Sequence, residues 1–195
     1  MSRKRLVLII LGVGVVLGFC LGIGMGVLTS GAGRRAFRGA FSSEEPADVA
    51  HPCSIDRDGF ALEYPGNWRI EGGGRGDDPD SLLSLDSPGN SFVTLAIYDM
   101  PTDPADNLAI QLEHFVPSQM ARPAREDLDR WGAYEGRGVV LKGRTVIGAM
   151  PARLRIFSSS GPTRPFVVVE MVFDEDRADV EPGLGLVEET FRLKP

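Results

Sequence analysis

The sequence offers little of the chemistry that most enzymes need. It contains only two histidines and two cysteines among its 195 residues. No serine elbow, zinc-ligand spacing or phosphate-binding loop occurs in it. We therefore expect no catalytic site, no metal site and no cofactor, and we expect a role in binding.

The two cysteines cannot stabilise the domain through an internal disulfide. Cys20 lies in a long apolar run, and Cys53 lies just before the region with strand-like patterns. Neither has a partner in the rest of the chain. A free thiol at each position and an intermolecular disulfide through Cys53 both remain open, and the disulfide requires an oxidising compartment.

Acidic residues are absent from the first 40 residues, which hold six basic ones. The rest of the chain carries 15 basic and 27 acidic residues, a net charge of −12. Nucleic-acid binding needs clustered lysine and arginine, so this balance argues against a nucleic-acid partner. It also disfavours adsorption of the whole domain to anionic lipid.

An uncharged run of 24 residues, 6–29, interrupts the basic N-terminal region. As a helix at ~1.5 Å per residue it is roughly 36 Å long, which is enough to span a bilayer. We expect a cytoplasmic stub at residues 1–5 and an uncleaved transmembrane signal-anchor in the bacterial inner (plasma) membrane. The C-terminal domain is then periplasmic or extracellular. A cleaved signal peptide ending near Ser30 is the alternative.

Small residues recur every fourth position along this run and so share one helix face. Such a ladder lets a second helix approach closely, which predicts self-association and a homodimer. The residues of the ladder are Gly14, Gly18, Gly22 and Gly26.

Residues 30–54 mix glycine, arginine, serine and proline with little periodicity, so we expect a flexible tether. Residues 55–195 are expected to form one globular domain. It begins with alternating apolar residues at 60–64, a Pro65-Gly66-Asn67 turn, and Trp68 as an aromatic anchor. This pattern predicts a hairpin over residues 60–70.

The remaining patterns alternate between strands and helices. Residues 81–86 and 92–100 predict a second hairpin, and Asp103 and Pro104 start a helix that reaches about residue 120. Broken strands follow at 131–141, 144–147 and 152–157. The nearly continuous apolar run 166–173 predicts a central strand covered on both faces. A terminal helix over 180–193 is expected to be interrupted by Pro182 and Gly183.

This order of elements resembles the PsbP/DcrB-like family over about residues 55–195. The residues that carry the resemblance are Phe60, Tyr64, Pro65, Trp68, Val146, Gly148, Pro151, Ala152, Arg153, Val187, Phe191 and Leu193. The resemblance implies an α+β fold, an α/β/α-type sandwich with a mainly antiparallel central sheet. It also implies a non-catalytic function, because members of the family mostly bind other proteins.

We therefore expect a membrane-anchored, protein-binding or chaperone-like module with an envelope protein as its partner. Its expected partner surface combines an acidic loop with a basic strand face. The residues of this surface are Asp77, Asp78, Asp80, Arg153 and Arg155.

Two other functions remain open. A small hydrolase or ligand-binding domain would use carboxylates such as Asp99 or Glu113, the second beside His114. A structural scaffold would dimerise through the glycine ladder and Cys53.

Overall fold

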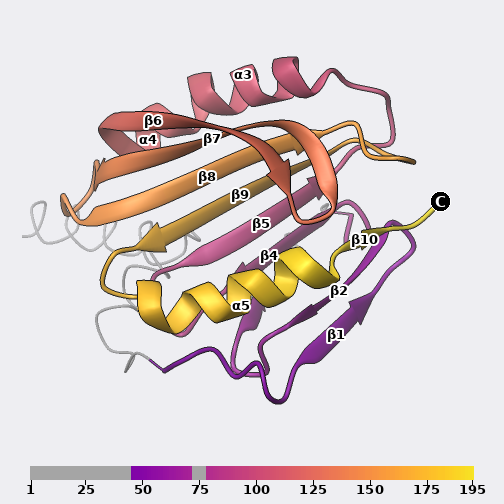
Figure 1. Ribbon diagram of the computed structural model, residues 1–195, viewed down its shortest axis with the longest axis horizontal. Coiled ribbons are helices and arrows are strands. Elements are labelled where there is room, and N and C mark those ends of the chain that lie inside the picture. The colour runs from indigo at the N-terminus through magenta and orange to yellow at the C-terminus, as the bar shows by residue number, and fades with distance from the viewer. Residues whose placement is uncertain (1–44, 72–77) are drawn as a thin grey trace, which may run out of the picture. The chain divides into compact units, whose positions relative to one another are not determined.

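The computed structural model describes residues 45–71 and 78–195, which belong to the unit Ser43–Pro195 (Figure 1). The predicted stub, signal-anchor and glycine ladder lie outside the described residues and stay predictions. Within the described ranges, no helix is both long and apolar enough to cross a membrane.

A seven-stranded antiparallel sheet forms the centre of the fold, in the order β3-β4-β5-β9-β8-β7-β6. The predicted second hairpin, β4 with β5, and the predicted central strand, β9, are confirmed. The fold is an α+β sandwich, as expected. The strands are β3 (Arg69–Glu71), β4 (Leu82–Asp86), β5 (Phe92–Ile97), β6 (Met120–Trp131), β7 (Tyr134–Thr145), β8 (Pro151–Ser159) and β9 (Phe166–Phe173).

Helices α3 (Pro104–His114) and α4 (Val116–Gln119) cover one face of this sheet (Figure 1). The Asp103 side chain accepts a hydrogen bond from the Ala105 N–H at 2.8 Å, so the predicted N-cap is confirmed. Leu108 and Val116 are buried against the sheet. The predicted single helix divides at Phe115, because Pro117 has no N–H to continue the helical ladder.

Helix α5 (Arg177–Thr190) and a small sheet cover the other face. The small sheet has the antiparallel order β1-β2-β10, with β1 at Cys53–Asp56, β2 at Phe60–Tyr64 and β10 at Arg192–Leu193. The predicted interruption of α5 is wrong, since Pro182 and Gly183 lie inside a continuous helix. A Cβ on Gly183 would lie 2.6 Å from the Trp68 ring. The glycine therefore lets the helix approach the tryptophan closely.

The predicted hairpin over residues 60–70 is also wrong. Strand β2 pairs in the small sheet, whereas β3 pairs with β4 in the large one. The turn between them carries the chain from one layer to the other, and Trp68 is buried there, as expected of an anchor. Asp48 holds this turn, because its carbonyl accepts from the Gly66 N–H at 3.1 Å.

Part of the range predicted as tether is therefore in contact with the domain. The Ala47 N–H donates to the Asp179 carbonyl at 2.8 Å, and the Asp48 N–H donates to the Asn67 side chain at 2.9 Å. Strand β1 begins at Cys53, two residues before the predicted domain boundary.

The sequence patterns predicted no strand between residues 120 and 130, where β6 lies. It is an edge strand of 12 residues, and half of its side chains are exposed and charged. Charged residues on an exposed edge discourage pairing with other chains. They also hide the apolar alternation by which a strand is usually recognised.

Candidate functional site

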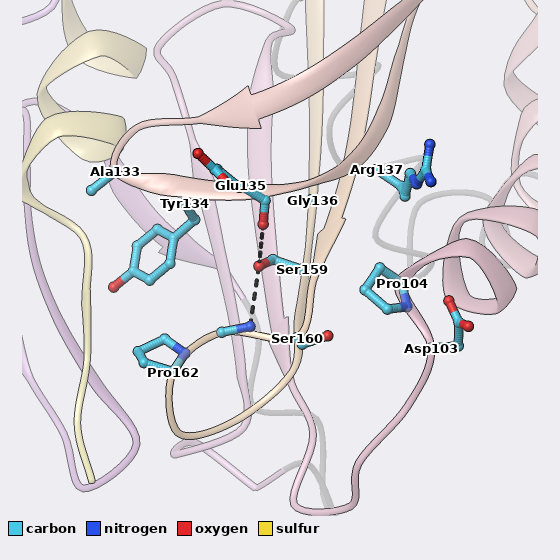
Figure 2. Close-up of a pocket in the computed structure, with 11 residues that line it drawn as sticks. Asp103, Pro104, Ala133, Tyr134, Glu135, Gly136, Arg137, Ser159, Ser160 and Pro162 are labelled. Atoms are coloured by element: carbon cyan, nitrogen blue, oxygen red, sulfur yellow. Dashed lines mark hydrogen bonds between the residues drawn. The ribbon is translucent and has the colours of Figure 1, made fainter.

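An open groove of about 610 Å³ lies at one end of the seven-stranded sheet (Figure 2). Three segments form it: the start of α3, the β6–β7 turn with the first residues of β7, and the loop between β8 and β9. They meet because β7 and α3 begin, and β8 ends, at this end of the sheet. The lining residues are Asp103, Pro104, Ala133, Tyr134, Glu135, Gly136, Arg137, Ser159, Ser160, Gly161 and Pro162.

Ser159 joins two of these segments. Its hydroxyl donates to the Glu135 carbonyl at 2.7 Å and accepts from the Gly161 N–H at 3.1 Å (Figure 2). Gly161 has φ +60°, and a Cβ there would lie 2.2 Å from the Arg164 carbonyl oxygen. Only glycine fits such a position, so the loop holds one backbone conformation.

The opposite wall, the β6–β7 turn, is fixed to the C-terminal part of the chain. The Tyr134 hydroxyl accepts from the Leu193 N–H at 3.0 Å. The Gly132 N–H donates to the Glu188 carboxylate at 2.8 Å, and Gly132 has φ +54°. The groove is therefore preformed on both sides.

The groove offers side chains of both charges. The exposed Arg137 guanidinium forms no ion pair with any residue in the ranges 45–71 and 78–195. Asp103 is also exposed and uses its carboxylate to cap α3. Glu135, the second acidic lining residue, pairs with Arg130 at 3.0 Å. One cation, two anions and several backbone groups suit the polar groups of an extended peptide.

Behind the β6–β7 turn lies a buried network of charges on the α5 face of the sheet. Glu170, at the centre of β9, is 1% exposed. It accepts from the Trp131 indole N–H at 2.7 Å and from the Arg155 guanidinium at 3.0 Å. Arg155 also donates to Glu188 at 3.0 Å. The network therefore ties the sheet centre to α5 and, through Trp131 and Glu188, to the groove wall.

Burial controls the ionisation of this network. Loss of hydration raises the pKa of the Glu170 carboxyl, against the opposing effects of Arg155 and of the Trp131 N–H. Burial alone lowers the pKa of Arg155. Glu170 and Glu188 together raise it by more than burial lowers it, so the pKa of Arg155 lies above its ordinary value. Arg155 is thus a permanent cation, and Glu170 is the group whose charge depends on pH.

The predicted basic face consists of arginines that are engaged within the chain. Arg153 pairs with Glu181 of α5 at 3.0 Å, and its side chain is 20% exposed. Arg155 belongs to the buried network and is 18% exposed. Both side chains therefore lie beneath α5.

The predicted acidic loop is described only in part, because Asp77 lies outside the described residues. Asp78 and Asp80 form a turn before β4, in which the Asp80 N–H donates to the Asp78 carboxylate at 3.0 Å. They are not among the groove residues.

Cys53 is an exposed free thiol in β1, where it pairs in register with Tyr64. The intermolecular disulfide through this residue stays a prediction.

The carboxylates considered for a hydrolase are not brought together. Asp99 precedes α3 and pairs with Arg164 at 3.3 Å, whereas Glu113 lies in the last turn of this helix. Neither carboxylate is among the residues that line the groove. Within residues 45–71 and 78–195, no three histidine, cysteine, aspartate or glutamate side chains are grouped as metal ligands would be.

No protein-family model matches the sequence, and no curated protein matches it significantly. Solved structures with a similar fold include the Ran-binding protein Mog1p of Saccharomyces cerevisiae, at 10% identity and a TM-score of 0.46, over 73% of this chain and 95% of that one. Cyanobacterial PsbP (CyanoP) of Synechocystis is similar at 12% identity and a TM-score of 0.44, over 80% and 100%.

A third similar structure is LpqN of Mycobacterium tuberculosis, described as involved in cell envelope biogenesis. It has 11% identity and a TM-score of 0.40, over 74% of this chain and 91% of that one. The likeness is one of fold. At such low identity it assigns no partner and no site.

Proposed function

We propose that this chain is a non-catalytic protein-binding module of the bacterial cell envelope, anchored by residues 6–29. Its groove receives an extended segment of a protein partner. The observation that carries this proposal is the groove itself, which is open and is held on both walls by hydrogen bonds between side chains and the backbone.

The groove favours a protein segment over a small molecule. Small-molecule sites bury most of the ligand surface and are lined mainly by apolar and aromatic side chains. Here the only aromatic lining residue is Tyr134, and charged residues and backbone groups surround it. A preformed groove also reduces the entropy lost when a flexible peptide binds.

Site-specific crosslinking in intact cells tests the proposal. A photoreactive amino acid replaces Ser160, an exposed groove residue, or Ser118, an exposed residue of α4, which is absent from the groove lining. We expect a discrete crosslinked species from position 160 and none from position 118. Equal crosslinking at both positions, or none at either, would contradict the assignment of the groove.

A charge reversal refines the test. In the chain with the photoreactive residue at 160, Arg137→Glu should reduce the crosslinked fraction because the groove loses its cation. Arg125→Glu changes the net charge equally on exposed β6, where Arg125 pairs with Asp127 at 3.4 Å. It should leave the crosslink unchanged.

The membrane placement is tested separately by protease accessibility. With residues 6–29 spanning the inner membrane, protease added to spheroplasts should digest the C-terminal domain while a cytoplasmic control protein survives. Protection of the domain until lysis would place it in the cytoplasm and remove the envelope part of the proposal.

A further inference from the structure

The turn between β7 and β8 lies at the end of these strands opposite the groove residues (Figure 1). It carries two exposed large aliphatic side chains. Val146 is 52% exposed and Ile147 is 82% exposed. Gly148 and Ala149 follow with φ values of +78° and +50°. The apolar pair therefore sits on a tight turn and contributes nothing to either core.

Three backbone groups of this turn, the Val146 N–H and the carbonyls of Ile147 and Ala149, have hydrogen-bond partners within the domain. The Thr145 N–H donates to the Met150 carbonyl at 2.9 Å, and the Thr145 hydroxyl donates to the Ile147 carbonyl at 2.6 Å. That hydroxyl also accepts from the Met150 N–H at 3.0 Å. The Val146 N–H donates to the Gln119 carbonyl at 2.9 Å.

Each of these bonds lowers the cost of bringing the turn towards an apolar medium. A backbone group that enters hydrocarbon without a partner loses its bond to water, which is costly.

Two arginines stand at the base of the turn. Arg144 donates to the Ala149 carbonyl at 2.8 Å, which leaves the rest of its guanidinium free to bind. Arg122 is exposed, and it follows Ala121, which is paired with Arg144 in the sheet. In the described ranges, neither arginine forms an ion pair. Asp174 of the adjoining β9–α5 turn, whose N–H donates to the Pro151 carbonyl at 3.0 Å, is paired with Arg177 at 2.5 Å.

We propose that this turn inserts Val146 and Ile147 into the surface of an anionic lipid bilayer, with Arg122 and Arg144 bound to headgroup phosphates. Apolar side chains flanked by basic ones fit the boundary between acyl chains and headgroups. A protein socket fits less well, because two side chains supply only a small part of the roughly 800 Å² that one partner buries in a standard interface.

The charge of the domain explains why this contact would be local. A region with a net charge of −12 is repelled by anionic lipid as a whole. Only a surface where cations are unpaired can approach it. A contact this small is weak and reversible by itself, and it gains strength when the chain is already held at the membrane.

The test uses the full chain reconstituted into nanodiscs of phosphatidylcholine alone or with phosphatidylglycerol. In a Cys20→Ser, Cys53→Ser background, a polarity-sensitive fluorophore is attached at Ile147→Cys. The matched control carries it at Ile110→Cys, an aliphatic position that is 52% exposed on α3. We expect a blue shift and protection from an aqueous quencher at 147 in phosphatidylglycerol discs, and neither change at 110.

Arg122→Ala should reduce the inserted fraction about fivefold, which is the effect of one basic side chain at an anionic surface. Arg125→Ala should not, since Arg125 lies further along β6 and is paired with Asp127. Equal fluorescence at 147 and 110 in all discs would overturn the proposal. So would a shift at 147 that requires an added protein. The groove crosslink at position 160 does not depend on this result.

Discussion

The two faces of the seven-stranded sheet are both covered by a helix, but they are built from different chemistry. Beneath α3 and α4, the inward residues of β9 are Val167, Val169 and Met171, and they pack in one apolar cluster with Leu108 and Leu154. Beneath α5, the charged Glu170 lies between Val168 and Val172. The stability of the α3 face depends on how well apolar side chains fill its core. The stability of the α5 face also depends on the ion-pair and hydrogen-bond partners of the buried Glu170.

This difference separates stability from positioning. A buried ion pair contributes little net stability, because the desolvation of two charges offsets most of their attraction. Its loss is nevertheless severe when one partner is removed. The network of Glu170, Arg155 and Glu188 is therefore best understood as a device that fixes α5 and the β6–β7 turn in one arrangement. The α3 face needs no such network, because the hydrogen bonds that hold the β6–β7 turn come from the α5 side.

The largest effect is expected when the buried charge loses its cation. Arg155→Met keeps much of the side-chain volume but leaves Glu170 without its ion-pair partner. We expect the free energy of unfolding of residues 43–195 at neutral pH to fall by about 3–5 kcal/mol. Urea denaturation followed by tryptophan fluorescence measures it. A loss below about 1 kcal/mol, the range of an exposed ion pair, would show that the charge is not effectively buried.

On the α3 face the corresponding change is the loss of volume. Leu154 is fully buried on β8, one residue before Arg155. Leu154→Ala should lower the free energy of unfolding by about 2–5 kcal/mol because it leaves a cavity. The same denaturation measurement applies. Crosslinking at position 160 should persist in this variant under folding conditions, since the charge network is intact.

A smaller effect is expected from Trp131→Phe. The ring still packs against Phe166 and Phe191, whose centroids lie 6.1 and 5.4 Å from that of Trp131. Only the N–H donor to Glu170 and part of the ring are lost, so the free energy of unfolding should fall by about 1–3 kcal/mol. Phe166→Leu removes aromatic packing without touching the hydrogen bond and serves as the control.

The smallest effect concerns pH and applies to one face only. Because the pKa of Glu170 is raised by burial, the folded state holds this proton more tightly than the unfolded state. Stability should therefore decline as the pH rises from the ordinary carboxyl pKa through the folded one, by up to about 1.4 kcal/mol per pH unit.

Glu170→Gln should remove that part of the pH dependence. The loss caused by Arg155→Met should shrink as the pH falls, because the carboxyl is then neutral. The loss caused by Leu154→Ala should stay constant over the same range. Unfolding curves at several pH values distinguish these cases, and parallel pH profiles for both variants would refute the assignment to Glu170.

Local patterns predicted the elements of this fold better than their connections. The apolar runs at 81–86 and 92–100 predicted a hairpin of neighbouring strands, and the run at 166–173 predicted the central strand. The Pro65-Gly66-Asn67 turn is locally typical of a hairpin. However, nothing local shows that the chain changes layer there, because the change depends on where Trp68 is buried.

The site was harder to predict for the same reason. Its lining comes from residues 103–104, 133–137 and 159–162, which only the strand order brings together. Glu170 was a visible signal, a single charge inside an apolar run, but its partners Trp131 and Arg155 are distant in sequence. Val146 and Ile147 continue a strand-like pattern, so their exposure becomes evident only when the position of the turn is known.

The first residues of strand β7 line the groove, and its last residue precedes the β7–β8 turn that we propose enters the lipid. Its 12 residues, at ~3.4 Å each, form a rigid spacer of roughly 40 Å. With the turn resting on a bilayer, the groove is held at a fixed height above the headgroups. Partners whose binding segments reach that height are selected, and those confined to the membrane surface are not.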